Sequence, residues 1–162
     1  MAPRILATRP HMPGYGVSSD ERSLRPWSWA EEILREGHNY WVATVAPDGL
    51  PHAMPVWGVW HECQFWFSTG GLSQKARNLA WRAECSVGTE RGANAVIVEG
   101  AATRFVAGDA PVEIARLYGA KYGGGFPEDS PLFRVEPRVV FGFSEAADEF
   151  GETATRWAFE KA

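Results

Sequence analysis

The sequence holds few cysteines and lysines, no long apolar run and no cluster of basic residues. Its two cysteines, Cys63 and Cys85, match no spacing used for metal ligation or for a redox pair. No apolar run reaches the roughly 18 residues that a membrane-spanning helix needs. The net charge is -4 and no basic stripe is present, which argues against nucleic-acid binding. We therefore expect a reduced, cytoplasmic protein without a membrane span.

Lysine is rare enough that each position is informative. The chain has Lys75, Lys121 and Lys161, whereas lysine and arginine together number 16. Lys75 lies in "FWFSTGGLSQKARNL", where an aromatic run, two glycines and a polar helix-like segment meet. Tryptophan, in contrast, is abundant, with eight residues. Tryptophans pack in cores and interfaces, and some could form a wall for a flat ligand.

The length of 162 residues favours one domain. Residues 1–26 contain four prolines and two glycines, a composition that predicts an extended, irregular arm. Residues 27–162 would then form the single domain. Ser28 and Glu31 fit a capping box for a helix that ends at Gly37.

The rest of the pattern is mainly β. Runs rich in β-forming residues are separated by short turns, and they cover 40–45, 51–60, 64–68, 85–90, 96–105, 138–144 and 155–159. Two helical stretches, 73–82 and about 110–121, interrupt them. Pro51 and Pro55 indicate an edge or a bulge in the second strand. The pattern predicts a mainly β (α+β) fold, a small antiparallel barrel with a few peripheral helices.

The junction after the strand at 64–68 is a candidate anion site. Ser73 can cap the following helix, whose first-turn N–H groups would then face an anion. Lys75 adds a positive charge in that turn, and Gly70 and Gly71 let the backbone approach a ligand closely. The motif GxxxxGK[ST] is absent, so nucleotide hydrolysis is not implied. The alternative is a capped surface helix with solvated charges.

The motifs between about Tyr40 and Val106 resemble, in their order, the split β-barrel family. They are "ATVAPDGLPH", "PVW", "FSTG", "SQKARNL" and "IVEG". That family includes pyridoxamine 5′-phosphate oxidases and the flavin/deazaflavin-dependent oxidoreductases that use FMN or coenzyme F420. The resemblance implies an FMN-binding split β-barrel and a homodimer with cofactors at its interface. It also implies hydride transfer between the cofactor and a small-molecule substrate.

The resemblance further implies which residues bind the cofactor. The phosphate would lie at the strand-to-helix junction, and the ring would lie against the second strand. The implied phosphate-site residues are Ser68, Thr69, Ser73, Gln74 and Lys75, with Arg77 as a second cation. The implied ring-site residues are His52, Met54, Pro55, Val56 and Trp57, with Asn94 as a contact across the dimer interface.

Three positions depart from the pyridoxamine phosphate oxidases. Those enzymes carry an Arg and, five residues later, a Lys on the second strand, where this chain has Met54 and Val59. Gln74 replaces the Arg that usually precedes the motif lysine. Loss of one charged contact would weaken the hold on a phosphate ester by about 1.5–3 kcal/mol. The pattern therefore favours an F420-dependent oxidoreductase acting on a small or mid-sized conjugated organic substrate. The cations available for the F420 tail are Arg77, Arg82 and Arg91.

Other interpretations stay open from the sequence. The same scaffold with FMN, or a non-catalytic carrier of a flavin or haem, would fit these motifs. No catalytic side chain is implied, and the candidate proton donors are Tyr15, Tyr40 and His52. His52, His61 and Cys63 fit no standard ligand spacing, so we expect no metal site.

Overall fold

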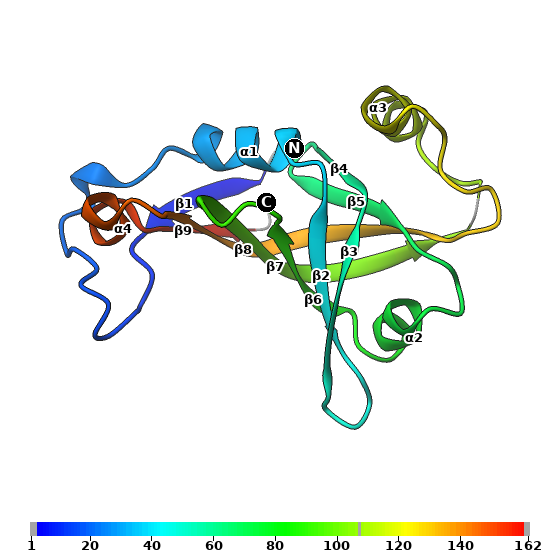
Figure 1. Cartoon of the computed structure of the whole chain (residues 1–162), viewed down its shortest axis with the longest axis horizontal. Helices are drawn as coiled ribbons and strands as arrows, with labels where there is room; N and C mark the ends of the chain where they lie inside the picture. The colour runs from blue at the N-terminus through cyan, green and yellow to red at the C-terminus, as the bar shows by residue number, and fades with distance from the viewer. Residues whose placement is uncertain (1–2, 107, 161–162) are drawn as a thin grey trace.

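The computed structural model describes residues 3–106 and 108–160 (Figure 1). Within these ranges the strands are β1 (Arg4–Thr8), β2 (Tyr40–Val45), β3 (Pro51–Val56), β4 (Gly58–His61), β5 (Gln64–Ser68), β6 (Glu84–Thr89), β7 (Asn94–Phe105), β8 (Leu132–Ser144) and β9 (Thr155–Glu160). The helices are α1 (Trp27–Glu36), α2 (Gln74–Trp81), α3 (Val112–Tyr122) and α4 (Ala147–Thr153), with a short 3-10 turn, η1, at Glu21–Ser23. None of the helices described is long and apolar enough to cross a membrane.

The strands form one antiparallel sheet that splits along β8. The main order is β1-β9-β8-β7-β6-β2-β3, and β5 joins β4 to β8. One edge of β8 pairs with β7, while its other edge pairs with β5 over 132–135 and with β9 over 139–142. Pro137 lies at this change of partner, opposite Gly100, where a side chain would collide with the Glu136 carbonyl. The prediction of an antiparallel split β-barrel with peripheral helices is confirmed.

The helices lie around the barrel and leave most of β3 exposed, up to the buried Val56. In Figure 1, α1 lies along one side of the sheet, and the β2–β3 hairpin and α2 extend from the opposite side. The main core contains buried side chains from most strands, including Tyr40, Phe65, Phe67, Val98 and Trp157. A smaller core under α3 contains Val59, Trp66, Ile114, Tyr118 and Leu132. β3 is the last strand of the main order, so the edge predicted from its prolines is confirmed.

Several local predictions were wrong. Arg4–Thr8 is not irregular but forms β1, which pairs with β9. α1 begins at Trp27 after Pro26, without a side-chain cap, so Ser28 is not the N-cap. The second predicted strand is two strands, separated at Trp57. β8 begins six residues earlier than predicted, since it starts at 132 rather than 138, and α4 was missed. The division into an arm at 1–26 and a domain at 27–162 stays a prediction.

Candidate cofactor-binding site

The junction between β5 and α2 has the geometry of a capped helix start. Ser73 is the N-cap of α2, as predicted, and its Oγ accepts a hydrogen bond from the Ala76 N–H at 3.2 Å. The Ser73 Oγ also lies 3.2 Å from the Thr69 Oγ1. The backbone N–H groups of Gln74 and Lys75 have no acceptor among the described residues. Free N–H groups at a helix start, with two hydroxyls beside them, form a place for an anion.

Lys75 is the feature of this junction that a surface helix does not explain. It lies on the buried face of α2 and is only 9% exposed. Within 3–106 and 108–160, its ammonium has no hydrogen-bond or ion-pair partner. Burial lowers the pKa of Lys75, because the charged form loses hydration. A partly desolvated cation without a partner is less favourable than a hydrated one, and an anion at the α2 N-terminus would compensate for the lost hydration.

The side chains of α2 connect the junction to β2 and β3. Gln74 donates to Asn78 at 2.7 Å and accepts from Arg77 at 2.7 Å. Asn78, which is fully buried, donates to Thr44 on β2 at 3.0 Å. Thr44 in turn donates to the His52 carbonyl on β3 at 3.4 Å. This chain of bonds fixes α2 against the edge of the sheet, and the sequence interpretation missed Asn78 and Thr44.

Two further groups border the junction. The Ser68 hydroxyl donates to the Pro131 carbonyl at 3.0 Å, so its proton is already used by the segment before β8. The Arg104 guanidinium, at the end of β7, lies 3.6 Å from the position that a Cβ on Gly71 would take. Arg104 was missed from the sequence because β7 is distant from α2 in the chain. The cations around the junction are therefore Lys75, Arg77 and Arg104.

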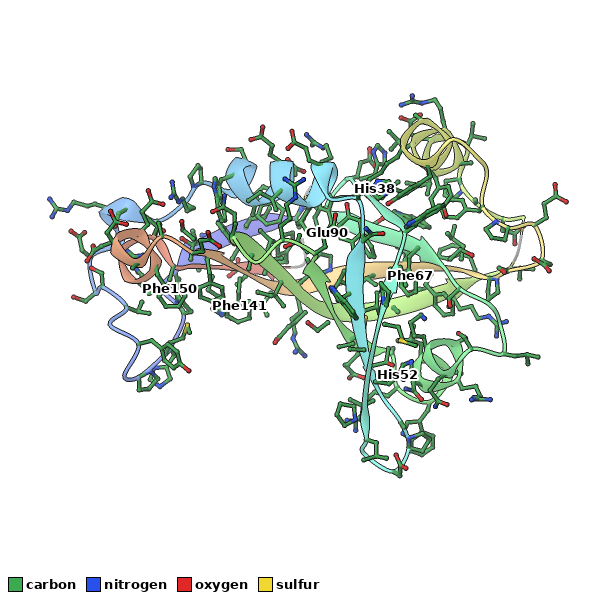
Figure 2. All side chains as sticks on the ribbon, viewed as in Figure 1. His38, His52, Phe67, Glu90, Phe141 and Phe150 are labelled. Atoms are coloured by element: carbon green, nitrogen blue, oxygen red, sulfur yellow. The ribbon has the colours of Figure 1, made fainter. Side chains whose placement is uncertain are left out.

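The predicted ring-site residues divide between the two faces of β3. His52, Met54 and Val56 pair with alternate residues of β2 on the face that α2 contacts through Thr44. Pro55 lies on the opposite face, with Trp41 as its partner. Figure 2 shows His52 low on β3, beside α2. The structure thus brings β3 and the α2 junction together on one side of the sheet.

Trp57 lies beyond β3, at the break before β4, and is supported by α3. Its indole stacks on Tyr122 with ring centroids 4.7 Å apart and planes 3° apart, and it remains 49% exposed. His38 contacts both rings, at 6.1 Å from Trp57 and 5.1 Å from Tyr122. Tyr122 exchanges hydrogen bonds with Gly58, accepting from its N–H at 3.0 Å and lying 2.9 Å from its carbonyl. The last residues of α3 therefore belong to this site, although the sequence interpretation did not include them.

Lys121, the residue before Tyr122, also binds the backbone at Gly58. Its ammonium donates to the Tyr40 hydroxyl at 2.7 Å, to the Gly58 carbonyl at 3.0 Å and to the Arg35 carbonyl at 3.4 Å. It also lies 4.8 Å from the centroid of the Tyr40 ring. Burial lowers the pKa of Lys121 to about 8, while the nearby charge of Glu90 opposes this shift.

The lowered pKa of Lys121 predicts a pH-dependent contribution to stability. An unfolded lysine has a pKa of about 10.4, so between about pH 8 and that value the unfolded chain holds a proton that the folded chain has lost. Unfolding then takes up a proton, and raising the pH disfavours it. We expect the free energy of unfolding of the wild type, minus that of Lys121→Met, to rise by about 1–2 kcal/mol from pH 8 to pH 10. Urea titrations at both pH values test this, and a constant difference would contradict it.

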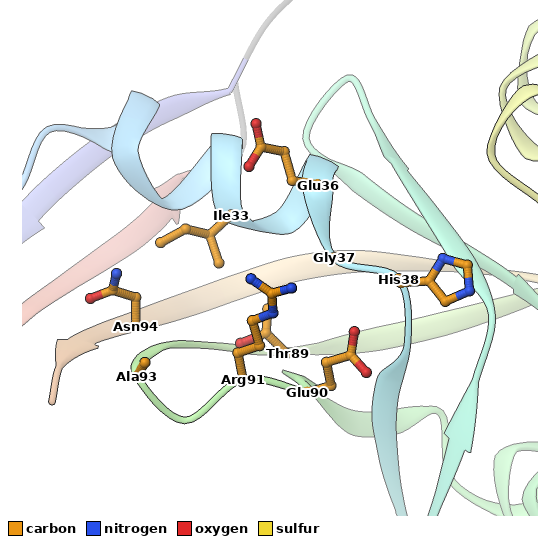
Figure 3. Close-up of a pocket in the computed structure, with 9 residues that line it drawn as sticks. All are labelled: Ile33, Glu36, Gly37, His38, Thr89, Glu90, Arg91, Ala93 and Asn94. Carbon is orange, nitrogen blue, oxygen red and sulfur yellow. The ribbon is translucent and has the colours of Figure 1, made fainter.

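Asn94 lies away from the phosphate junction of its own chain. It begins β7 and lines a pocket of about 380 Å³ between the end of α1 and the β6–β7 loop (Figure 3). Glu36, His38, Glu90 and Arg91 also line this pocket. Arg91 is thus separated from Arg77, and Arg82 follows the opposite end of α2 from Ser73. The three cations expected for one tail groove are not brought together within the chain.

The candidate proton donors differ in accessibility. Tyr40 has no exposed surface, and its hydroxyl bonds to the Leu34 and Gly37 carbonyls at 2.7 Å each. Burial also raises its pKa, so Tyr40 cannot reach a substrate. Tyr15 is exposed and lies near Phe150 of α4, and His52 lies on β3. No group of three or more potential metal ligands occurs in the described part of the chain.

The family model described as "Pyridoxamine 5'-phosphate oxidase" matches residues 29–144, which include β2 to β8, the α2 junction and the end of α3. No curated protein sequence matches the chain.

Solved structures share the fold at low sequence identity. The conserved hypothetical protein Rv2991 of Mycobacterium tuberculosis is 19% identical, with a TM-score of 0.66 over 81% of this chain and 92% of that chain. A structure described as an F420 reductase is 21% identical, with a TM-score of 0.57 over 68% and 94%. The heme storage protein HutZ of Vibrio cholerae is 19% identical, with a TM-score of 0.58 over 70% and 91%. At these identities the structural similarity shows that the proteins share a fold.

Proposed function

This chain belongs to the pyridoxamine 5′-phosphate oxidase family, and on that premise we propose that it is an F420-dependent oxidoreductase. Its substrate would be a small or mid-sized conjugated organic molecule. The observation that supports a phosphate-bearing cofactor most directly is Lys75, a partly desolvated cation with a buried stem and no partner in the described structure, at the start of α2. The free N–H groups of the same turn and the hydroxyls of Thr69 and Ser73 add neutral donors around it.

The residues around the junction fit the cofactor phosphate and a further anionic group. Lys75 and the α2 N-terminus suit the phosphate, because a helix start and an ammonium both favour negative charge. Arg104 lies near Gly71, Arg77 lies on α2 beside Gln74, and both are exposed. They would extend the positive surface toward the anionic tail of F420, which FMN lacks. This arrangement replaces the tail groove that the sequence predicted from Arg77, Arg82 and Arg91.

The chain's own residues would orient and shield the cofactor. The edge of β3 would offer backbone groups to the polar side of the ring, and Trp57 would cover one end of it. Val56 is buried and anchors β3 at that end. When bound, F420 would supply the hydride-transfer chemistry. His52 and Tyr15 stay candidates for a proton donor.

The position of Met54 supports F420 over FMN. Met54 is 46% exposed on β3, where pyridoxamine phosphate oxidases carry an Arg. We expect Met54→Arg to shift preference toward FMN by about tenfold, because it supplies one charged hydrogen bond to a compact phosphate. Paired titrations with FMN and F420 measure the ratio of their dissociation constants. Met54→Gln is the uncharged control, and an unchanged ratio in Met54→Arg would reject this placement of β3.

The proposed function is tested by titrating the purified chain with F420 and, separately, with FMN, while following its tryptophan fluorescence. Tighter binding of F420 supports the proposal and justifies a screen of conjugated substrates with the reduced cofactor. Preference for FMN would make the chain an FMN-dependent oxidoreductase of the same family. Binding of neither would reject the proposal and favour a carrier, which a titration with haem would then test.

A homodimer is part of the proposal, and the outer face of the sheet supports it. We use "outer face" for the side of the sheet that carries Leu6, Trp41, Pro55, Ile97, Phe141 and Phe143, as the strand registers align them. Trp41 is 49% exposed, and Leu6 is also exposed. The ring of Phe143 lies between those of Phe141 and Phe150, at 6.5 Å and 5.5 Å between centroids, and Figure 2 labels Phe141 and Phe150 at the α4 end of the sheet. A second copy covering the outer face would reach the exposed edge of β3, where we place the cofactor ring.

A further inference from the structure

The last two residues of α3 join three separate parts of the fold at one corner. Lys121 bonds to β2 through Tyr40, to the α1 end through the Arg35 carbonyl and to the β3–β4 junction through the Gly58 carbonyl. An ammonium has three N–H donors, so all of them are used and the side chain is fixed. Tyr122 follows directly and donates to the His38 carbonyl at 2.8 Å while contacting Gly58. Two side chains of α3, Lys121 and Tyr122, thus make hydrogen bonds to the backbone of Gly58.

This corner carries the indole of Trp57. Trp57 precedes Gly58, and one face of its indole is covered by the parallel ring of Tyr122. The side chain is still 49% exposed. A second aromatic ring stacked behind an indole attracts it and limits its rotation. An exposed indole held in one orientation is suited to contact a flat ring.

The interaction of Lys121 is not an ordinary ion pair. Its acceptors are two carbonyls and one hydroxyl, all uncharged, and no carboxylate lies within ion-pair distance of it among the described residues. Partial burial removes some hydration of the ammonium, and the three hydrogen bonds and the faces of the Tyr40 and Tyr122 rings replace it. A methionine of similar length could fill the same place, but it would make none of these hydrogen bonds. What the lysine adds is therefore a fixed position of the end of α3 against Gly58.

From this geometry we infer that Lys121 is a positioning residue for the cofactor ring. It holds the end of α3 against Gly58, so that Tyr122 backs Trp57 and the indole keeps the orientation that the ring contacts. The inference rests on the proposed function, because it takes Trp57 as part of the ring site. The inference extends the ring site to the end of α3. It also assigns ring binding and phosphate binding to different residues, Lys121 and Lys75.

The test measures ring binding and phosphate binding separately. The ring probe is the phosphate-free deazaflavin–ribityl fragment of F420, and the phosphate probe is inorganic phosphate in competition with F420. Lys121→Met is expected to weaken the ring probe by about 3- to 10-fold, through the lost support of the stack, and to leave inorganic phosphate unchanged. Lys75→Met is expected to do the reverse. Arg116→Met, on the exposed face of α3, is the matched control and should change neither.

Variants of Tyr122 separate the stack from its hydrogen bonds. Tyr122→Phe keeps the aromatic ring behind Trp57 and should retain most of the ring affinity, whereas Tyr122→Leu should lose as much as Lys121→Met. A purely structural role for Lys121 predicts equal losses for the ring probe and for inorganic phosphate. That result, or unchanged ring affinity in Lys121→Met, would overturn the inference.

Failure of the proposed function would be recognised separately. If the wild type binds neither F420 nor its ring fragment, the cofactor assignment is rejected. The positioning of Trp57 is then measured by acrylamide quenching of the emission that Trp57→Phe removes. Lys121→Met should increase the quenching of that emission, and unchanged quenching would overturn the role of Lys121.

Discussion

Replacing Lys75 with methionine is expected to weaken F420 binding by at least about tenfold, since a charged hydrogen bond is worth about 1.5–3 kcal/mol. The same change should leave the chain without ligand as stable as the wild type, or more stable. Methionine can pack where the lysine stem lies on the buried face of α2, and it removes a partly desolvated charge that has no partner in the described structure. Affinity and stability would therefore move in opposite directions. Isothermal titration calorimetry and thermal unfolding without ligand measure the two effects.

Arg82→Met is the matched control for this experiment. Arg82 follows the C-terminal end of α2 and is exposed, so its loss removes the same charge without touching the junction. It should change F420 affinity by less than about twofold, the effect of a screened surface charge. Equal affinity in Lys75→Met and the wild type would remove the phosphate from the α2 junction. A large loss of stability in Lys75→Met would instead mean that the ammonium stabilises the fold through contacts of its own.

The α2 junction could be predicted from sequence because its geometry is local. Ser73 precedes a helical segment by one position, and a capping hydroxyl needs only its own helix to act. Gly123 ends α3 with a φ of 77°, a conformation that glycine adopts at little cost. In both cases a few adjacent residues determine the structure. The split β-barrel, in contrast, was predicted from the resemblance of the ordered motifs between Tyr40 and Val106 to a known family.

The parts that were missed depend on residues far apart in the chain. Arg4–Thr8 becomes a strand because β9, some 150 residues later, pairs with it. Arg104 reaches the junction only because β7 and β8 bring its end beside Gly71. Lys121 was noted as a rare lysine, but its partners come from α1, β2 and the β3–β4 junction. No local sequence pattern predicts such contacts, because each forms only when the barrel brings distant segments together.

Asn78 is an intermediate case, because a signal was present in the sequence. It occupies a position on α2 between the buried Lys75 and Leu79, where a purely structural helix would carry an apolar residue. A polar residue at such a position indicates a buried hydrogen bond, which the structure supplies from Thr44. The polar residue at this buried helix position was therefore a signal that Asn78 makes a hydrogen bond. The sequence did not predict that its partner is Thr44.

Trp41→Asp is expected to convert the proposed homodimer into a monomer and to abolish tight cofactor binding. Trp41 lies on β2, one strand in from the β3 edge of the outer face, between Pro55 of β3 and Gly88 of β6. Burying an unpaired carboxylate against a second copy costs several kcal/mol, which exceeds what a dimer of moderate affinity can lose. Because the partner would border β3 at this point, loss of the dimer should also weaken F420 binding by about 100-fold or more, an effect of about 2.7 kcal/mol or more.

Trp81→Asp provides the comparison that makes the result specific. Trp81 is 66% exposed at the end of α2, and no strand register places it on the outer face. The same charge there should leave the oligomeric state and F420 affinity unchanged, so a general effect of removing an exposed indole can be separated from an interface effect. Multi-angle light scattering after size exclusion measures the mass, and fluorescence titration measures the affinity. A wild type that is monomeric, or a Trp41→Asp variant that stays dimeric, would move the interface away from this face. A monomer that binds F420 as tightly as the wild type would instead place the whole cofactor site within one chain, on β3, the α2 junction and the end of α3.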